Sequence, residues 1–343
     1  MNAGRTLGAA LGLSRARPDR DRGGHVWTKD REAVSADGVT IRYTVLGGDD
    51  DTIPLVLCAG YLCPDNHWAR VAGALAERHP VVVLNYRGVG ASGCPPDRGS
   101  RLRPARAEDY TIERLAGDVA AVLDAEGLTG TVALGHSMGC EVALALWRQR
   151  PDLVAGLVLV TGPFSSPMRT FYGTDLGSRL FPLLYHAVPL VPGPIRRLAA
   201  LAPRLPVAMP VARAIRALGP YTPVEEMDDY FRHLAACDPA VAVEVARGMH
   251  DFDAGPWLHE VDVPTHVLVG SADPWSPKEV GEEMLAAIPD AELRVVHDAT
   301  HGALLEFPDE IHDAIADFLH RRLGCAAAPT RGRPGRVSAL RRH

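Results

Sequence analysis

The clearest chemical pattern in the chain is a serine with a glycine two residues away on each side, in the stretch GHSMG, residues 135–139. An apolar run at 131–134 predicts a buried strand before it, and the periodicity of 138–150 predicts a helix after it. A serine on such a sharp strand-to-helix turn projects its hydroxyl away from the sheet, and the glycines lack Cβ atoms that would collide with neighbouring backbone. The helix N-terminus adds N–H donors for an oxyanion. Ser137 is therefore predicted to be a nucleophile.

Serine is a weak nucleophile without a base and an acid that orients the base. His301 lies between the last predicted strand and the last predicted helix, and Asp273 follows a buried strand, where ligand-facing residues of open α/β sheets gather. In the chain order Ser137, Asp273, His301, the histidine Nε2 can take the serine proton while the aspartate fixes the tautomer. These three residues are the predicted catalytic set.

Each of the two partners has an alternative. His297 is the rival base, but it directly follows the predicted strand at 291–296, which leaves it too early in the loop to reach over the sheet edge. Asp298 is the rival acid. Asp273 itself could instead cap the helix that follows it. We favour His301 and Asp273.

The elements that must position these residues alternate along the chain. Early strands with alternating polarity suggest an antiparallel start, and later continuously apolar strands suggest parallel strands covered on both faces. Repeated strand, helix, strand units predict an α/β fold with a doubly wound, mostly parallel sheet. The predicted strands are 25–34, 39–47, 54–60, 80–88, 131–134, 155–160, 264–273 and 291–296, and the predicted helices are 67–78, 111–126, 138–150, 278–288 and 308–323.

The alternation of strands and helices stops between residues 163 and 256. No buried strand is evident there, and prolines separate short helical pieces. We interpret this stretch as an inserted helical cap. The predicted organisation is a disordered leader (1–25), a core in two parts (26–162 and 257–323) around the cap (163–256), and a disordered basic tail (324–343). Helical pieces of the cap are expected at 192–202, 211–219, 223–238 and 240–249.

Several motifs together resemble the α/β-hydrolase family of capped esterases and related enzymes, from about residue 34 to 323. The matching pieces are LVLCAGY with Trp68 following, VVVLNYRGVGASG, GHSMG, GSADPWSP and THGALLEFPDEIHDAIADFL. The resemblance implies an eight-stranded sheet, a triad of Ser137, Asp273 and His301, and an oxyanion hole from the backbone N–H groups of Tyr61 and Met138.

This chain departs from the family pattern at two places. It has Ala59-Gly60 where most relatives have His-Gly, and Asn85 where most have Asp. The stretch Cys58-Ala59-Gly60-Tyr61 looks like a Cys-Asn-Gly variant of the oxyanion loop. Backbone donors do not depend on the side chain at position 59, so the oxyanion hole is expected to remain. Related epoxide hydrolases and haloalkane dehalogenases use an aspartate as the nucleophile. Ser137 at this position therefore argues against both activities.

The inserted segment and the loop after Asp273 are expected to shape the substrate pocket. Trp275 stands two residues after the predicted acid, and Phe164 and Met168 begin an aromatic stretch with few charges. Such side chains can hold an apolar acyl group or ring. They can equally join the cap helices to the core. Phe171, Tyr172, Phe181 and Tyr185 belong to the same stretch.

Composition excludes several function classes. The chain has 343 residues and a net charge of −6, with basic residues scattered through its body, so no nucleic-acid footprint is expected. No apolar run reaches the length of a membrane span, so no stable membrane insertion is expected. Six cysteines without metal-like spacing suggest free thiols, no metal site and a cytoplasmic location. Without a phosphate-binding or dinucleotide motif, no cofactor is implied.

The sequence thus predicts a serine hydrolase that cleaves an ester-like bond of a small apolar substrate through an acyl-enzyme. A non-catalytic ligand receptor on the same fold is the alternative from another class. A carbon–carbon bond hydrolase or a perhydrolase is the alternative reaction type, since the motif does not separate serine enzymes from one another. The sequence does not indicate the oligomeric state.

Overall fold

The computed structural model describes residues 27–325, apart from 48–51, 96–104, 188–201, 206, 215 and 217. The predicted leader and residues 326–343 of the predicted tail lie outside the described residues. Eight strands form one sheet in the order β1-β2-β4-β3-β5-β6-β7-β8. The strands are β1 (Arg31–Val34), β2 (Thr40–Leu46), β3 (Leu55–Cys58), β4 (Val81–Leu84), β5 (Thr131–His136), β6 (Val154–Val160), β7 (Thr265–Gly270) and β8 (Ala291–Val296).

The sheet changes from antiparallel to parallel after its second strand, as predicted. β1 pairs with β2 and β2 pairs with β4 in antiparallel register, and all other neighbours are parallel. Every residue of β3, β4, β5 and β7 is buried, whereas exposed or half-buried residues recur in β1, β2 and β8. Strands covered on both faces therefore carry the continuously apolar sequences.

Two apolar cores lie on opposite faces of the sheet because successive strand side chains point to opposite sides. In β3, Val56 and Cys58 join the core that includes α2, α3 and α9. Leu55 and Leu57 join the core that includes α1 and α11. The core helices are α1 (Ala69–Leu75), α2 (Ile112–Glu126), α3 (Met138–Gln149), α9 (Lys278–Ala287), α10 (Ala303–Glu306) and α11 (Pro308–Leu323).

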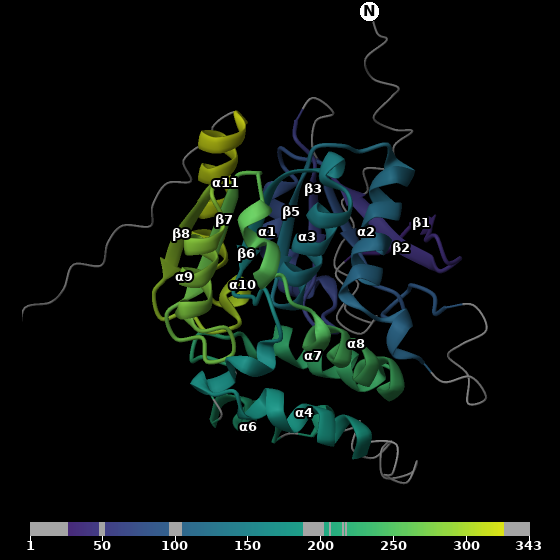
Figure 1. Cartoon of the computed structure of the whole chain (residues 1–343), viewed down its shortest axis with the longest axis vertical. Helices are drawn as coiled ribbons and strands as arrows, with labels where there is room; N and C mark the ends of the chain where they lie inside the picture. Colours follow the sequence, from purple (N-terminus) through teal and green to yellow (C-terminus); the bar gives the residue numbers. More distant parts are fainter. Residues whose placement is uncertain are drawn as a thin grey trace, which may run out of the picture.

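Between β6 and β7 the chain leaves the sheet and forms the inserted segment, residues 163–256. Its α-helices are α4 (Leu176–Ala187), α6 (Ala208–Ala214), α7 (Val224–Ala236) and α8 (Pro239–Asp251). In Figure 1, α7 and α8 lie between the sheet and the pair α4 and α6. None of the described helices is both long enough and apolar enough to cross a membrane.

The helices of the inserted segment match the sequence prediction unevenly. α7 and α8 occur where periodicity placed helices, and α6 begins three residues before the predicted start at 211. α4 was not predicted, because Pro182 inside it reads as a helix breaker. The predicted helical piece at 192–202 lies almost wholly outside the described residues.

Short 3-10 turns connect many of these elements. The predicted helix at 67–78 is one example, since it is divided into a 3-10 turn and the shorter α1. The turns are η1 (Asp65–Trp68), η2 (Ala107–Asp109), η3 (Pro151–Leu153), η4 (Pro167–Arg169), η5 (Phe171–Gly173), η7 (Ala202–Arg204) and η8 (Gly255–Glu260).

α3, the helix that follows Ser137, carries a buried carboxyl group. Glu141 is fully buried, and neither of its carboxyl oxygens has a hydrogen-bond partner among the described residues. Burial, with a smaller contribution from the nearby Glu113, raises the pKa of Glu141 well above its ordinary value of 4.5. The folded protein therefore binds more protons than the unfolded chain above pH 4.5.

Replacing Glu141 by methionine is expected to stabilise the protein, by about 1 to 3 kcal/mol near neutral pH, because it removes an unpaired buried polar group. Since the raised pKa of Glu141 makes the wild type lose stability as pH rises above 4.5, the advantage of Glu141→Met should grow with pH. Urea unfolding at a series of pH values checks this. A constant difference between the two proteins across pH would contradict it.

Candidate active site

Ser137 occupies a strained turn between β5 and α3. Its φ is 56° and its ψ is −125°, a conformation that non-glycine residues rarely adopt and that costs on the order of 1 to 3 kcal/mol. The turn is fixed at both ends, because the Ser137 N–H donates to the Val160 carbonyl (3.2 Å) and the Cys140 N–H donates to the Ser137 carbonyl (2.9 Å). The hydroxyl is thereby held at the C-terminal edge of the sheet.

Glycines allow neighbouring backbone to approach this turn. A Cβ on Gly135 would overlap the Gly139 carbonyl, and a Cβ on Gly139 would overlap the Cys58 carbonyl at the end of β3. Gly162, after β6, has the same role, since its Cβ would overlap the Cys140 side chain. The expected reason for glycine at 135 and 139 is therefore confirmed, and Gly162 is a third position that the sequence did not single out.

The structure brings together the three residues that the sequence indicated. His301 Nε2 lies 2.8 Å from Ser137 Oγ, and His301 Nδ1 lies 2.9 Å from Asp273 Oδ2. Asp273 follows β7 and His301 follows β8, so parallel strands bring both loops to the edge where β5 ends. The alternatives His297 and Asp298 are exposed on the surface.

The second carboxylate oxygen of Asp273 is also bound, so the side chain has a fixed orientation. Oδ1 accepts from the N–H groups of Trp275 (2.8 Å) and Ser276 (3.1 Å). The Asp273 side chain is fully buried, and its Oδ2 accepts a hydrogen bond from His301 Nδ1–H. This tautomer leaves the lone pair of Nε2 facing the Ser137 hydroxyl. The arrangement can therefore transfer the serine proton to His301.

His136, the residue before the serine, supports the backbone of the His301 loop. Its Nε2 lies 3.0 Å from the His301 carbonyl, which can only accept, so Nε2 carries a hydrogen. Burial, with a smaller effect of His301, lowers the pKa of His136 to about 4, so the ring is neutral at physiological pH. Thr161 Oγ1 approaches the same carbonyl at 3.4 Å. Although His136 lies inside the quoted motif, the motif pattern leaves this position open and gave no signal for its role.

Tyr61 and Met138 lie on the two segments that meet beside the serine. A Cβ on Gly60 would lie 3.2 Å from Ser137 Cβ, so the loop after β3 passes directly beside Ser137. Neither the Tyr61 N–H nor the Met138 N–H donates to an acceptor among the described residues. Two free amides beside a serine hydroxyl can bind an oxyanion.

The inserted segment contacts Tyr61 from two sides. Tyr61 Oη donates to the Ala242 carbonyl of α8 (2.8 Å), and Tyr230 Oη of α7 lies 3.4 Å from the Tyr61 carbonyl. Leu62, which follows, has a positive φ of 47°. These contacts tie the loop after β3 to the inserted helices, and the sequence gave no indication of them because they join residues far apart in the chain.

Asn85, one of the two departures from the family pattern, supports the loop after β4. Its Oδ1 accepts from the Ala91 N–H (3.2 Å). The neighbouring Arg87 is buried and binds two carboxylates, with its NH2 group 2.6 Å from Asp118 and its NH1 group 2.7 Å from Asp37. The loop is therefore held by an amide acceptor and a buried ion pair.

The three predicted pocket residues lie in different surroundings. The Trp275 ring lies 5.1 Å from the His301 ring, centroid to centroid, and its Nε1 lies 3.3 Å from Tyr172 Oη. Phe164 is half-buried and packs against the core on the α3 face of the sheet. Met168 lies beside Gly177 of α4. Trp275 thus adjoins the triad, and a pocket role for Phe164 and Met168 stays a prediction.

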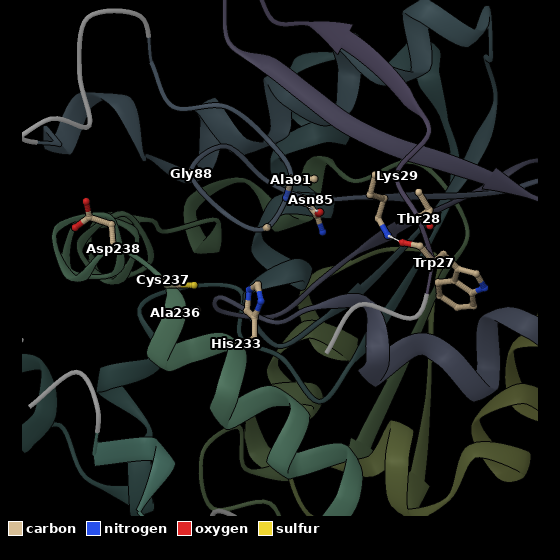
Figure 2. Close-up of a pocket in the computed structure, with 11 residues that line it drawn as sticks. Trp27, Thr28, Lys29, Asn85, Gly88, Ala91, His233, Ala236, Cys237 and Asp238 are labelled. Carbon is tan, nitrogen blue, oxygen red and sulfur yellow. Dashed lines mark hydrogen bonds between the residues drawn. The ribbon is translucent and has the colours of Figure 1, made fainter. Parts of the chain in front are cut away.

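A cavity of about 380 Å³ lies between the loop after β4, the end of α7 and the residues that precede β1. Figure 2 shows His233 and Cys237 on one side of it and Lys29 and Asn85 on the other. Lys29 forms a buried ion pair with Asp65, so the wall carries little net charge there. Among the described residues, no group of three or more His, Cys, Asp or Glu side chains is arranged to hold a metal ion.

Comparison with known sequences gives one family and several relatives. A sequence model of the family described as "alpha/beta hydrolase fold" matches residues 53–308. The protein named "Putative carbamate hydrolase RutD" of Caulobacter segnis is 27% identical over 264 residues, which cover 74% of this chain and 85% of that protein. The N-formylmaleamate deformylase of Pseudomonas putida is 28% identical over 291 residues, covering 84% and 96% respectively.

Solved structures agree in architecture. A hydrolase from Pseudomonas aeruginosa PA01 superposes with a TM-score of 0.65 at 25% identity, covering 84% of this chain and 97% of that one. An esterase from Exiguobacterium antarcticum superposes with a TM-score of 0.66 at 20% identity, covering 84% and 98%. The second likeness, at this identity, concerns the fold alone.

Gly139→Ala is expected to destabilise the protein by about 3 kcal/mol, because the added methyl group would overlap a strand carbonyl that cannot move away. Gly117→Ala in α2 is the matched control, since a Cβ there meets nothing within 4 Å. That control should gain about 0.5 to 1 kcal/mol from helix propensity. Thermal unfolding compares the two. Equal melting temperatures would disprove the close approach of α3 to β3.

His136→Leu should lower kcat/KM by about tenfold to a hundredfold on whichever substrate is turned over, because the His301 carbonyl loses the shorter of its two hydrogen bonds and keeps only the longer one from Thr161. His136→Gln should restore most of the activity, since its amide nitrogen can donate to the same carbonyl. Because His136 is neutral above its pKa of about 4, the pH profile of His136→Gln should keep the wild-type shape. Equal activity in all three proteins would rule out this positioning role.

Proposed function

The chain belongs to the α/β-hydrolase fold family and is a hydrolytic enzyme, and from that premise we propose that it acts through a Ser137, His301 and Asp273 triad. The observation that carries the proposal is the continuous path from Ser137 Oγ to His301 Nε2 (2.8 Å) and from His301 Nδ1 to Asp273 Oδ2 (2.9 Å). The strained turn at Ser137 supports it, because such strain is concentrated at functional sites.

In the first step, Ser137 Oγ attacks the carbonyl carbon of the substrate while His301 Nε2 accepts the hydroxyl proton. Asp273 keeps Nδ1 protonated and stabilises the imidazolium that forms. The electron pair of the carbonyl moves to its oxygen, which the N–H groups of Tyr61 and Met138 bind. When the intermediate collapses, the leaving group takes the proton from His301 and an acyl-enzyme remains.

In the second step, water attacks the acyl carbon and gives its proton to His301. The second tetrahedral intermediate uses the same two amides, and its collapse returns the proton to Ser137 Oγ and releases the acid. Ser137 and His301 alone change protonation state in this cycle, because the two amides donate hydrogen bonds without losing a proton and Asp273 remains a carboxylate.

We assign an ester-like bond of a small, largely apolar substrate to this site. The inserted segment serves as a cap in this proposal, and Trp275 contributes an apolar wall beside His301. Phe171 continues that wall, since its ring lies 5.5 Å from that of Trp275. An apolar wall of this kind selects a substrate by its shape and apolar area and not by the bond that is cleaved. It is therefore compatible with several leaving groups.

Hydrolysis of a carbon–nitrogen bond is the second candidate, and the names of the relatives favour it. One relative is named as a carbamate hydrolase and another as a deformylase of an N-formyl compound. The same triad can cleave such bonds when His301 protonates the nitrogen that leaves. The two candidates differ in leaving group and share Ser137 as nucleophile.

A cytoplasmic location is proposed with this function. All six cysteines lie among the described residues, and none forms a disulfide. Cys58 and Cys140 are fully buried in the core. Free thiols are typical of a reducing compartment.

Labelling with a fluorophosphonate tests the nucleophile without knowledge of the substrate. Wild-type protein should gain one covalent phosphonyl group at Ser137, and Ser137→Ala should gain none. Ser178→Ala, in α4, is the matched control and should be labelled like the wild type. Peptide mass spectrometry locates the adduct. An unlabelled wild type would favour a ligand receptor, and labelling of Ser137→Ala would disprove the assignment.

A panel of substrates then separates the bond types. p-Nitrophenyl esters from acetyl to palmitoyl, N-formyl amides and alkyl carbamates are compared in wild type and Ser137→Ala. Removal of the nucleophile should lower kcat by at least about a thousandfold on the true substrate class. The preferred acyl length measures the pocket. Turnover of amides and carbamates with no esterase activity would replace the first candidate by the second.

A further inference from the structure

The inserted segment exposes an unusual amount of apolar surface. Twelve large apolar side chains are exposed among the described residues, and ten of them lie between positions 172 and 224. On α4 the exposed leucines are 43 to 68% accessible, and on and before α6 three further side chains are 52 to 58% accessible. These residues are Leu176, Leu180, Leu183 and Leu184, with Leu205, Val207 and Val211.

The leucines of α4 form one stripe that faces away from the rest of the protein. Their spacing of four, three and one residues places them on one side of a helix. The opposite side contacts α8, where the Phe181 ring lies 4.6 Å from the His250 ring and Tyr185 Oη lies 3.0 Å from a Glu244 carboxylate oxygen. The stripe is therefore not the face that joins α4 to the protein.

α6 has the same two-sided character. Met209 and Ala212 pack against the small core formed with Leu218, while Val207 and Val211, four residues apart, are exposed. In Figure 1, α4 and α6 lie beyond α7 and α8 as seen from the sheet, so their outer sides form the end of the molecule farthest from the sheet. An apolar surface of this kind normally marks an interaction site.

The charge around these helices decides which partner fits. Residues 163–222 contain seven arginines and one aspartate, with no lysine or glutamate, whereas the whole chain has a net charge of −6. Arg169, Arg179, Arg213 and Arg216 are exposed. Of these four arginines, Arg179 alone pairs with the aspartate, Asp175 (2.6 Å). An exposed apolar face on a segment with excess positive charge fits a negatively charged apolar surface.

We propose that the outer faces of α4 and α6 bind the surface of an anionic lipid bilayer. Leucines at helical spacing with arginines beside them are the features of helices that lie in the membrane interface. A symmetric dimer through this face fits less well, because it would place the same arginines against one another. Interfacial binding adds to the proposed hydrolase activity and does not require it.

Vesicle flotation tests the proposal with the full chain. Vesicles of phosphatidylcholine alone are compared with vesicles that contain an equal amount of phosphatidylglycerol. Binding to the anionic vesicles should be at least about tenfold stronger and should weaken as salt is added, since each arginine near the surface contributes about fivefold. Ser137→Ala protein should bind equally well, so the failure of this inference and that of the proposed catalysis are distinguishable.

Two variants locate the contact. The triple change Leu180→Ser, Leu183→Ser and Leu184→Ser should lower vesicle binding at least about tenfold by removing apolar area. Arg213→Gln with Arg216→Gln should lower binding to anionic vesicles only. Leu285→Ser on α9 is the control, because Leu285 is exposed (39%) but lies outside the inserted segment, and it should bind like the wild type. Circular dichroism checks that each variant is folded.

Three results would overturn the proposal. Retained binding by the leucine variant would place the contact elsewhere, for example at the arginines beyond residue 325. Absence of vesicle binding together with a dimer that the leucine variant abolishes would assign the surface to a second copy of the chain. A monomer that binds neither kind of vesicle would leave no lipid contact at all.

Discussion

The site depends on one close approach, that of the N-terminus of α3 to the end of β3. Gly139 allows it, because any side chain there would overlap the Cys58 carbonyl. The approach forces Ser137 into its strained conformation and places the loop with Gly60 beside the serine. The Ser137 hydroxyl and two amides therefore converge through backbone packing, and their geometry does not depend on flexible side chains.

The parallel sheet brings Asp273 and His301 to Ser137 from distant parts of the chain. Asp273 and His301 follow two adjacent strands, and strand register sets how far their loops reach toward Ser137. Backbone contacts then fix each side chain: two N–H groups hold Asp273, and His136 holds the carbonyl of His301. Orientation is thus provided by groups that remain neutral, namely backbone N–H groups and the His136 ring.

Much of this arrangement could be predicted from the sequence, because strands buried on both faces and the serine turn have strong local signals. The order of Ser137, Asp273 and His301 identified the residues that meet. α4 was missed because Pro182 masks its periodicity, and the contacts of Tyr61 with α7 and α8 were missed because they are tertiary. The position of Trp275 beside His301 could not be predicted, because it is set by how two loops far apart in the chain fold against each other.

Because Tyr61 is attached to two helices of the inserted segment, that segment cannot be exchanged independently of the rest of the enzyme. An insertion between strands can be exchanged during evolution or by engineering when it contacts only the substrate. Here the Tyr61 hydroxyl and carbonyl are bound by Ala242 and Tyr230, so two helices of the insertion hold the loop that lies beside Ser137. A transplanted insertion that lacks these two contacts would alter turnover as well as specificity, and selection for new substrates must conserve them or replace both together.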